Sequence, residues 1–438
     1  MQFGTDGIRG VANTELTAEF ALRLGRAAAR ILGRDASDCR VVVGGDTRES
    51  TPMLDAALCA GFAVEGVGVI RLGVAPTPQV AFEAQRLGAL GAVVSASHNP
   101  FTDNGIKLFA RGGVKLGDDV ERQIAAELES LPTPTVAAGA IAVNPEADPY
   151  CEHVLAILEG RRLDGLKVVL DTANGAAFEV APGVLRASGA EVVVIAAEPD
   201  GRNINDECGA TSPAAVAAAV VAHNADVGIA LDGDADRLIA VDHTGAIVDG
   251  DHIIAVMATD LKARGRLHDD TVVVTVMTNL GFRLAMDKAD IAVVETAVGD
   301  RYVLEALASG GYSLGGEQSG HVIFTDHATT GDGLLTAVAL LDSVKRADVP
   351  LADLAAAVMT SLPQVLVNVR VAERMVDVAE QLADEIGSAN RTLGDSGRIL
   401  VRPSGTEPLI RVMVEAPTAE LATTVADEVA QAAERRFS

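Results

Sequence analysis

Two serines in the run 95–100 (Ser-Ala-Ser-His-Asn-Pro) could carry covalent chemistry. The run follows an apolar, strand-like stretch, and a serine hydroxyl becomes a useful nucleophile when a base or a metal ion activates it. Asn-Pro also ends strands, so a simple turn explains the run equally well when it is taken alone. From the residues, Ser97 and Ser95 are both candidate acceptors of a phosphoryl group.

Three carboxylates later in the chain supply the other half of such a site. Asp232, Asp234 and Asp236 are separated by small residues and can turn toward one hard cation, which takes oxygen ligands. A calcium loop is excluded, because it needs Gly at its sixth position and Glu at its twelfth, where this chain has Arg237 and His243. A phosphatase with Asp232 as nucleophile would leave the serine run without a role. The two runs together predict a metal-assisted phosphoserine enzyme.

Three further loops place polar residues on glycine-rich backbone. Residues 3–10 carry one arginine, and residues 315–321 offer a carboxylate, an amide, a hydroxyl and an imidazole. Residues 402–408 contain Ser, Gly and Thr in succession, which expose N–H groups and hydroxyls to an anion. Arg402 and Arg411 add bidentate donors beside them. Each loop alone is more simply a turn, but five such loops in one chain are too many to be explained as turns.

Repeated α/β units must position these loops. The strand predicted at 91–94 delivers Ser97, and the strand predicted at 227–231 delivers the aspartates, both at the end where α/β sheets usually place chemistry. The stretch 131–149, rich in Pro, Ala and Thr, predicts a linker. Three similar units predict a threefold α/β repeat. A helix is expected at 53–64, and further strands at 40–43, 167–170, 191–195, 271–276 and 292–295.

The tail has a different pattern. An alternating strand at 364–371 and a helix at 375–386 precede two paired strands at 398–401 and 409–415, and a helix at 420–435 closes the chain. This order predicts a small α+β domain that carries the anion loop.

Composition excludes several partners. The formal net charge of −26 over 438 residues argues against nucleic acid and anionic membranes, whose phosphates would be repelled. An anionic substrate would therefore need a locally basic cleft. No apolar stretch approaches the roughly 18–20 residues of a membrane span, and no export signal is expected. The four cysteines lack metal-site spacing, which favours free thiols in a reducing, cytoplasmic compartment; they are Cys39, Cys59, Cys151 and Cys208.

As a set, the five segments resemble the α-D-phosphohexomutase family, and within it the phosphoglucosamine branch. The resemblance runs from Phe3 to about Glu415. Ala235 and Gln318 match that branch, whereas the phosphomannomutase/phosphoglucomutase branch more often has Gly and Met there. The family fold implies three mixed α/β domains and a smaller α+β C-terminal domain around a central cleft. The expected boundaries are 1–147, 148–248, 249–362 and 363–438.

The resemblance also implies residue roles. Ser97 becomes the phosphoserine, and one Mg²⁺ is held by the three aspartates and a phosphoserine oxygen. Lys107 is the expected proton shuttle, with Arg9, His98 and His321 left open, although a solvated surface lysine is the simpler explanation of Lys107 from the sequence alone. Arg237 would meet phosphate oxygens. The sugar would contact Glu317, Ser319, Gly299 and Asp300. The distant phosphate would contact Arg402, Ser404, Gly405, Thr406 and Arg411.

The implied reaction interconverts glucosamine 6-phosphate and glucosamine 1-phosphate through a bound sugar 1,6-bisphosphate, which also serves as activator. The intermediate must turn end for end, and a C-terminal domain that opens and closes would permit this. A phosphomannomutase/phosphoglucomutase with the same chemistry and a phosphosugar phosphatase remain alternatives. A silent sugar-phosphate binding protein should lack the serine or an aspartate, and this chain has all of them. The expected partner is the small-molecule substrate, and a homodimer is left open.

Overall fold

The computed structural model describes residues 3–4, 6–33, 38–134, 137–144, 148–371, 377–403 and 408–437. The chain divides into two compact units. The larger unit comprises Met1–Met277 and Asp290–Val358, and the smaller unit comprises Thr278–Ala289 and Met359–Ser438. Within the described residues the larger unit holds three sheets and the smaller unit holds one.

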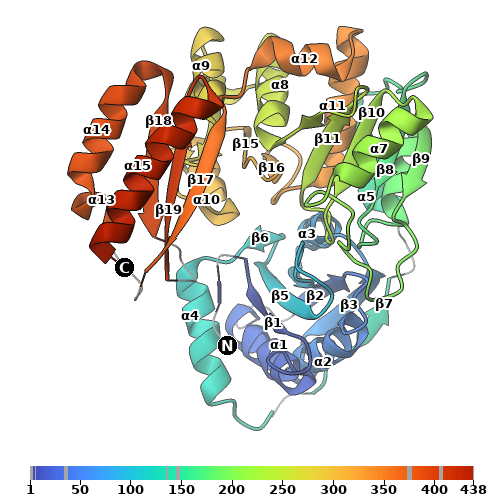
Figure 1. Ribbon diagram of the computed structural model, residues 1–438. Helices are drawn as coiled ribbons and strands as arrows, with labels where there is room; N and C mark the ends of the chain where they lie inside the picture. Colours follow the sequence, from blue (N-terminus) through green and yellow to red (C-terminus); the bar gives the residue numbers. More distant parts are fainter. Residues whose placement is uncertain are drawn as a thin grey trace. The chain divides into compact units, whose positions relative to one another are not determined.

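The first sheet of the larger unit has helices on both faces (Figure 1). Its strand order is β1-β5-β4-β2-β3-β7, with β6 paired to β5. Successive side chains of a strand point to opposite faces, so Val41 and Val43 pack against α1 and α2, whereas Val42 packs against α3. Burial on both faces explains the nearly continuous apolar strands. The elements are β1 (Ile8–Val11), α1 (Ala18–Leu32), β2 (Arg40–Gly45), α2 (Thr51–Val64), β3 (Gly68–Val74), α3 (Thr77–Arg86), β4 (Leu90–Val94), β5 (Asp103–Ala110), β6 (Val114–Lys115), α4 (Asp118–Glu129) and β7 (Ile141–Val143).

One expectation for this region is wrong. The stretch 131–149 is not only a linker, because it contains β7, which pairs in parallel with β3. All three residues of β7 are exposed. Their hydrogen bonds to the edge of the sheet, rather than any apolar pattern, make them a strand.

The second sheet delivers the aspartates. Its order is β12-β11-β10-β8-β9, and β10 lies parallel to β8 and antiparallel to β11. All five residues of β10 are buried, as the apolar run predicted. The elements are α5 (Asp148–Ala156), β8 (Lys167–Asp171), α6 (Val180–Ala187), β9 (Glu191–Ile195), α7 (Ala214–His223), β10 (Val227–Leu231), β11 (Leu238–Asp242) and β12 (Ile247–Val248).

The third sheet, of order β14-β13-β15-β16, carries the loop after residue 316. Asp332 caps the helix that follows, since its side chain accepts a hydrogen bond from the N–H of Leu335. The elements are α8 (Gly250–Ala263), the 3-10 helix η1 (His268–Asp270), β13 (Thr271–Thr275), β14 (Ala292–Thr296), α10 (Asp300–Gly310), β15 (Leu314–Gly316), β16 (Val322–Phe324), α11 (Gly333–Ala347) and α12 (Leu351–Val358).

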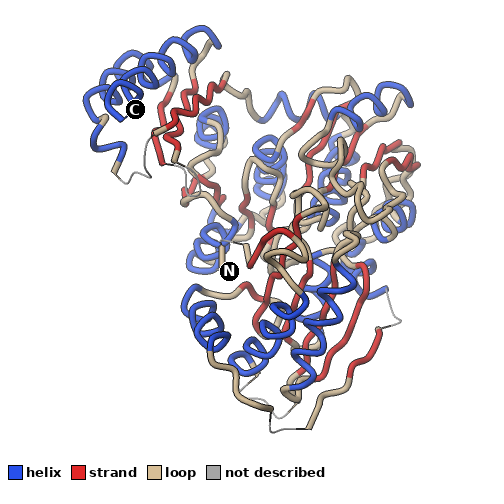
Figure 2. Tube along the Cα trace, turned by 60° about the horizontal axis from the view of Figure 1, so that its bottom comes forward, coloured by secondary structure: helices blue, strands red, loops and turns tan. Residues whose placement is uncertain are grey.

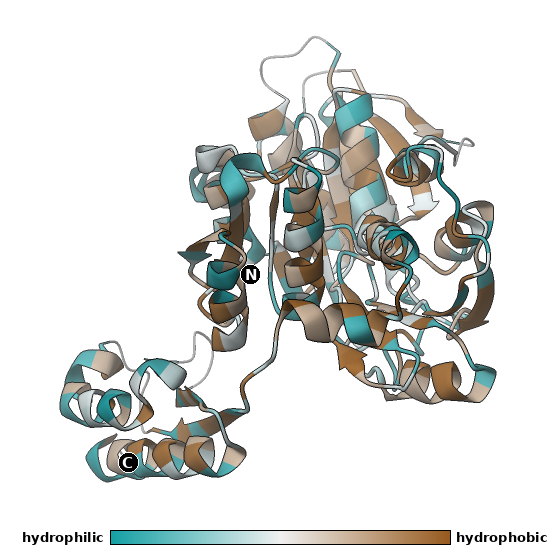
Figure 3. Cartoon of the chain, turned by 90° about the horizontal axis from the view of Figure 1, so that it is seen from above, coloured by the Kyte–Doolittle hydropathy of each residue, from teal (hydrophilic) through white to brown (hydrophobic). Residues whose placement is uncertain are grey.

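The smaller unit is the predicted α+β domain together with α9. Its antiparallel sheet has the order β17-β19-β18, and Figure 2 shows helices gathered on one side of these strands. The buried positions of α15 recur at helical spacing, and apolar and polar patches alternate around that helix in Figure 3. The elements are α9 (Leu280–Lys288), β17 (Gln364–Arg370), α13 (Val378–Gln381), α14 (Ala383–Leu393), the 3-10 helix η2 (Gly394–Ser396), β18 (Arg398–Pro403), β19 (Leu409–Glu415) and α15 (Ala419–Phe437).

The predicted helix at 375–386 is corrected in its described part. The chain there forms two helices, α13 and α14, because the backbone of Leu382 between them departs from helical geometry at φ −108°. Residues 375 and 376 lie outside the described residues. The predicted fold class is confirmed: mixed α/β domains are followed by a smaller α+β domain. Among the described helices, none is long and apolar enough to cross a membrane.

Candidate active site

The serine loop begins where β4 ends. Ser97 is 1% exposed, and its Oγ donates a hydrogen bond to Asp232 Oδ2 at 2.6 Å. His98 Nδ1 lies 3.2 Å from the same Oγ. Burial, followed by the charges of Arg237 and Arg9, lowers the pKa of His98 to about 4, so this imidazole is neutral near pH 7. Ser97 therefore has an aspartate and a neutral imidazole beside its hydroxyl.

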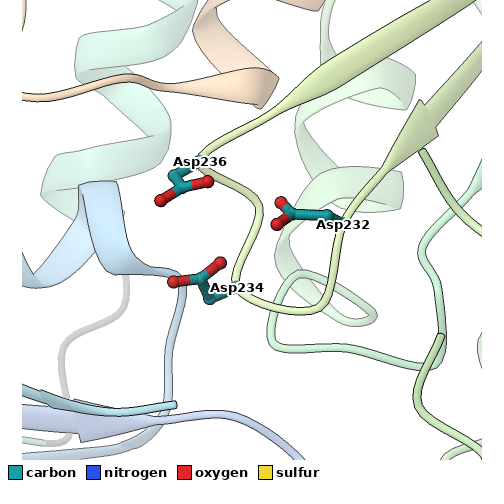
Figure 4. Close-up of side chains that lie close together, drawn as sticks. All are labelled: Asp232, Asp234 and Asp236. Atoms are coloured by element: carbon teal, nitrogen blue, oxygen red, sulfur yellow. The ribbon is translucent and has the colours of Figure 1, made fainter. Parts of the chain in front are cut away.

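The aspartate triad lies on the loop between β10 and β11, and its carboxylates turn toward a shared space (Figure 4). One oxygen from each residue lies within 4.8 Å of the others. Burial, with the charges of Asp236 and Asp234, raises the pKa of Asp232 to about 8. Burial also acts to raise the pKa of Asp236, but Lys107 and His321 lower it well below its ordinary value.

The triad suits a hard divalent cation. The buried Oδ1 atoms of Asp234 and Asp236 have no hydrogen-bond partner among the described residues. Three carboxylates with two such oxygens offer the oxygen ligands that a hard divalent cation takes. Arg237 donates its backbone N–H to Asp232 Oδ1 at 3.2 Å, which fixes one edge of the loop.

Lys107 is buried at the centre of the carboxylates. It lies on β5, directly opposite Val93 of β4, and its Nζ is 2.8 Å from Asp6, 2.9 Å from Asp234 and 3.0 Å from Asp236. Burial acts to lower the pKa of Lys107, but these carboxylates hold it well above its ordinary value. The surface-lysine interpretation is therefore wrong, because the antiparallel pairing of β5 with β4 turns this side chain inward.

The N-terminal loop brings Arg9 to the same cluster. Arg9 pairs with Asp6 at 2.6 Å and donates to Asn99 Oδ1 at 3.2 Å. Asp6 also contacts Lys115, which in turn pairs with Asp300. Burial acts to raise the pKa of Asp6, but Lys107 and Lys115 lower it overall. Sequence reasoning missed Asp6 and Lys115; Asp6 lay inside a recognised motif, and Lys115 had no signal.

The loop after β15 contributes Glu317 and His321 to the site. Glu317 Oε1 accepts a hydrogen bond from the N–H of Gly299 at 3.1 Å. The Nε2 atom of His321 accepts from the N–H of Gly331 at 3.2 Å, so in the neutral ring the proton is on Nδ1. Nδ1 lies 3.6 Å from Asp236 Oδ1. Burial acts to lower the pKa of His321, but the neighbouring carboxylates raise it overall.

A cavity of about 440 Å³ joins these loops within the larger unit. Ser319 is exposed and is not among the described residues that line it. The lining residues are Gly4, Asp6, Gly7, Arg9, His98, Asp236, Arg237, Val298, Gly299, Asp300, Glu317 and His321.

The anion loop belongs to the smaller unit. Arg402 and Arg411 are direct cross-strand partners on β18 and β19. Burial, followed by the charge of Arg411, lowers the pKa of Arg402. Two cations on directly paired residues repel each other, and an anion between them would relieve that repulsion. Ser404, Gly405 and Thr406 lie outside the described residues.

Sequence comparisons cover nearly the whole chain. The phosphoglucomutase/phosphomannomutase family matches as alpha/beta/alpha domain I at residues 1–134, domain II at 148–245, domain III at 249–362 and the C-terminal domain at 366–432. The phosphoglucosamine mutase of Rhodococcus opacus is 54% identical over 437 residues, 98% of each chain. That of Frankia alni is 55% identical over 442 residues, 98% of this chain and 97% of the relative.

Solved structures give the same assignment. A phosphoglucomutase/phosphomannomutase family protein from Burkholderia thailandensis superposes with a TM-score of 0.83 at 26% identity, over 98% of this chain and 97% of its own. A putative phosphomannomutase from Thermus thermophilus has a TM-score of 0.81 at 26% identity, over 99% of both chains. The N-acetylphosphoglucosamine mutase of Aspergillus fumigatus shares the fold at 19% identity, with a TM-score of 0.72 over 100% of this chain and 96% of its own. The chain therefore belongs to the phosphoglucomutase/phosphomannomutase family and is an isomerase of the phosphohexomutase class.

Proposed function

We propose that this mutase interconverts glucosamine 6-phosphate and glucosamine 1-phosphate, with Ser97 as its phosphoserine. One observation carries the assignment of the nucleophile: Ser97 Oγ lies 2.6 Å from Asp232 within a buried triad of carboxylates. The sugar is assigned from relatives named phosphoglucosamine mutase that are 53–55% identical over nearly the whole chain. A phosphomannomutase/phosphoglucomutase remains the alternative.

Asp232, Asp234 and Asp236 would hold a Mg²⁺ ion, with an oxygen of phosphorylated Ser97 as a further ligand. Such an ion neutralises charge on a phosphoryl group during in-line transfer. Arg237, which lines the cavity beside the triad, would meet the phosphate oxygens with its planar donors.

In the forward direction the bond between phosphorus and Ser97 Oγ breaks, and a new bond forms to the sugar hydroxyl, which loses its proton. The bound 1,6-bisphosphate then turns and returns its other phosphate to Ser97. Lys107 remains our candidate for moving the sugar proton, because its ammonium group can pass one proton to one of the three carboxylates that lie within 3.0 Å of it and then accept the proton of the sugar hydroxyl. Neutral His98, Arg9 and His321 line the cavity and remain alternatives.

The remaining loops would hold the rest of the substrate. Glu317, Gly299 and Asp300 line the cavity and would contact sugar hydroxyls or the 2-amino group, together with Ser319, which is exposed two residues after Glu317. The smaller unit would bind the phosphate that is not reacting, through Arg402, Ser404, Gly405, Thr406 and Arg411. The four domains would end at the boundaries expected from the sequence. Free cysteines, Cys39, Cys59, Cys151 and Cys208, support a reducing, cytoplasmic location.

The nucleophile is tested by intact-protein mass spectrometry. Wild-type protein exposed to a hexose 1,6-bisphosphate should gain one phosphate, Ser97→Ala should gain none and should lose mutase turnover, and Ser95→Ala should retain part of it. A fully active Ser97→Ala enzyme would exclude the phosphoserine.

The substrate is tested by comparing kcat/KM for the phosphates of glucosamine, glucose, mannose and N-acetylglucosamine. Glucosamine 6-phosphate should be preferred, but the margin over glucose should be modest because an amine and a hydroxyl are nearly isosteric. A tenfold preference for glucose or mannose would reassign the sugar and leave the mutase chemistry intact. Net release of inorganic phosphate would instead indicate the phosphatase.

A further inference from the structure

Ser97 has an unusual backbone conformation. Its φ is +52°, in the left-handed region that residues with a Cβ rarely adopt. Such a conformation costs free energy, so the surroundings must hold it. The groups that contact the backbone of Ser97 therefore determine where its Oγ lies.

Arg48 is one of these groups. It follows β2, and its side chain is fully buried beneath the serine loop. One guanidinium nitrogen, Nη2, donates to the carbonyl oxygen of Ser97 at 3.1 Å and to the carbonyl oxygen of Asn99. The other, Nη1, pairs with Asp46. A planar guanidinium is suited to hold an acid and two carbonyl groups at once.

Asn205 reaches the same two carbonyl groups from the loop between β9 and α7. Its Nδ2 donates to the oxygen of Ser97 at 2.9 Å and to that of Asn99 at 3.3 Å. Its buried Oδ1 has no hydrogen-bond partner among the described residues. Because an unpaired buried acceptor is costly, the two carbonyl contacts must outweigh that cost in this orientation.

The N–H of Ser97 is held as well. It donates to Ser95 Oγ at 2.9 Å, and Ser95 Oγ donates to Asp46 Oδ2 at 2.6 Å. Asp46 also accepts from the backbone N–H of Arg48 at 3.1 Å. Ser95, the alternative nucleophile, is therefore occupied in a hydrogen-bond chain that leads back to Arg48.

We propose that Arg48 and Asn205 are positioning residues that together hold the left-handed turn at Ser97 and aim its Oγ at the aspartate triad. The proposal rests on the proposed role of Ser97 as phosphoryl acceptor and donor. Neither residue is among the described lining of the 440 Å³ cavity. Loss of either should therefore lower kcat with little change in KM.

The test compares two variants of one loop. Asn205→Asp replaces the donor to the two carbonyl groups with a carboxylate that repels them. Asn203→Asp is the matched control, since Asn203 lies two residues away and its Nδ2 donates to the carbonyl oxygen of Glu198 instead. Displacement of a reacting group by about 1 Å can cost about 100-fold in rate. Asn205→Asp should accordingly lose about 100-fold in kcat with KM within about threefold, and Asn203→Asp should stay within about threefold in both.

Two further measurements separate positioning from folding. The rate at which a hexose 1,6-bisphosphate phosphorylates Ser97, followed by intact mass, should fall in Asn205→Asp by about the same factor as kcat. Arg48→Lys keeps the charge beside Asp46 and should retain more kcat than Arg48→Met at a matched melting temperature. If Asn205→Asp does not fold, Asn205→Ser, whose side chain is too short to reach the carbonyl groups, is judged by the same criteria.

A folded variant with wild-type kcat, or a loss confined to KM, would overturn the positioning role. The proposed function fails in a different way, because then the wild-type enzyme itself would carry no phosphate on Ser97 or would show no mutase turnover.

Discussion

Replacement of Lys107 by methionine tests the electrostatic balance of the site. The substitution keeps the apolar stem and removes the ammonium group that lies within 3.0 Å of Asp6, Asp234 and Asp236. Breaking a buried ion pair costs about 3–5 kcal/mol, because the remaining charge has no partner. Uptake of a proton by one of the carboxylates limits that cost and makes it depend on pH.

The pKa shifts determine whether stability rises or falls with pH. In the wild type, Asp6 and Asp236 have lowered pKa values, so their stabilisation is present above the unfolded value of about 3.9 and is lost in acid. Lys107 has a raised pKa, so its contribution lasts up to the unfolded value of about 10.4 and is lost only at higher pH. Between pH 5 and 8 these contributions are constant. Asp232, whose pKa is about 8, makes the stability of wild type and variant alike fall as pH rises.

Without Lys107, burial and mutual repulsion should raise the pKa of a carboxyl group into this window. The variant then loses stability as pH rises, by about 1.4 kcal/mol per pH unit for each proton taken up. Its deficit in unfolding free energy should therefore grow with pH from pH 5 up to the new pKa, by at most about 4 kcal/mol if that pKa reaches 8.

Urea unfolding of the metal-free protein, followed by circular dichroism, measures this deficit. Lys115→Met is the control, since Lys115 pairs with Asp6 and Asp300 rather than with the triad, and its deficit should be smaller. Added Mg²⁺ should restore more stability to Lys107→Met than to the control, because the ion replaces the lost positive charge. A deficit below about 1 kcal/mol that does not change with pH would refute the reasoning.

Three other outcomes are expected. Chelation should remove activity and Mg²⁺ should restore it. Asp234→Asn should weaken metal binding in a calorimetric titration, because an amide replaces a charged ligand. Full turnover of metal-free protein in excess EDTA would exclude a role of the ion in the reaction. Arg411→Ala should lower kcat/KM by roughly two orders of magnitude, the equivalent of about 2–4 kcal/mol for a lost charged donor, without unfolding the protein. Wild-type kinetics in this variant would show that Arg411 does not bind the substrate. Glu415→Gln should destabilise the smaller unit by about 3 kcal/mol, because fully buried Glu415 accepts from Arg398 at 2.7 Å and from the N–H of Leu280 at 2.8 Å. The control is Glu420→Gln, since Glu420 is exposed. Equal unfolding midpoints for the two variants would contradict the prediction.

The sequence by itself determined the strands that are buried on both faces. The run at 227–231 is apolar throughout because helices or loops cover both sides of β10, so its limits could be predicted to the residue. The run at 191–195 was also predicted to the residue, as β9, although its residues are only partly buried or exposed. The aspartate run and the serine run each follow a predicted strand at the edge where α/β sheets place chemistry, so the two loops could be predicted to meet, as Ser97 and Asp232 do. The choice of Ser97 over Ser95 came from the family resemblance.

Only the tertiary structure decided the partners of ordinary-looking polar residues. A lysine on a strand carries no sign of which face is buried, so the position of Lys107 among three carboxylates followed from the pairing of β5 with β4. The strand β7 exists because the edge of β3 accepts it, although its own residues are exposed. Arg48 and Asn205 come from loops that are distant in sequence and meet at the carbonyl groups of Ser97 and Asn99. The spacing of apolar residues along one segment indicates which of its side chains are buried. The contacts described here depend on which distant segments the fold brings together.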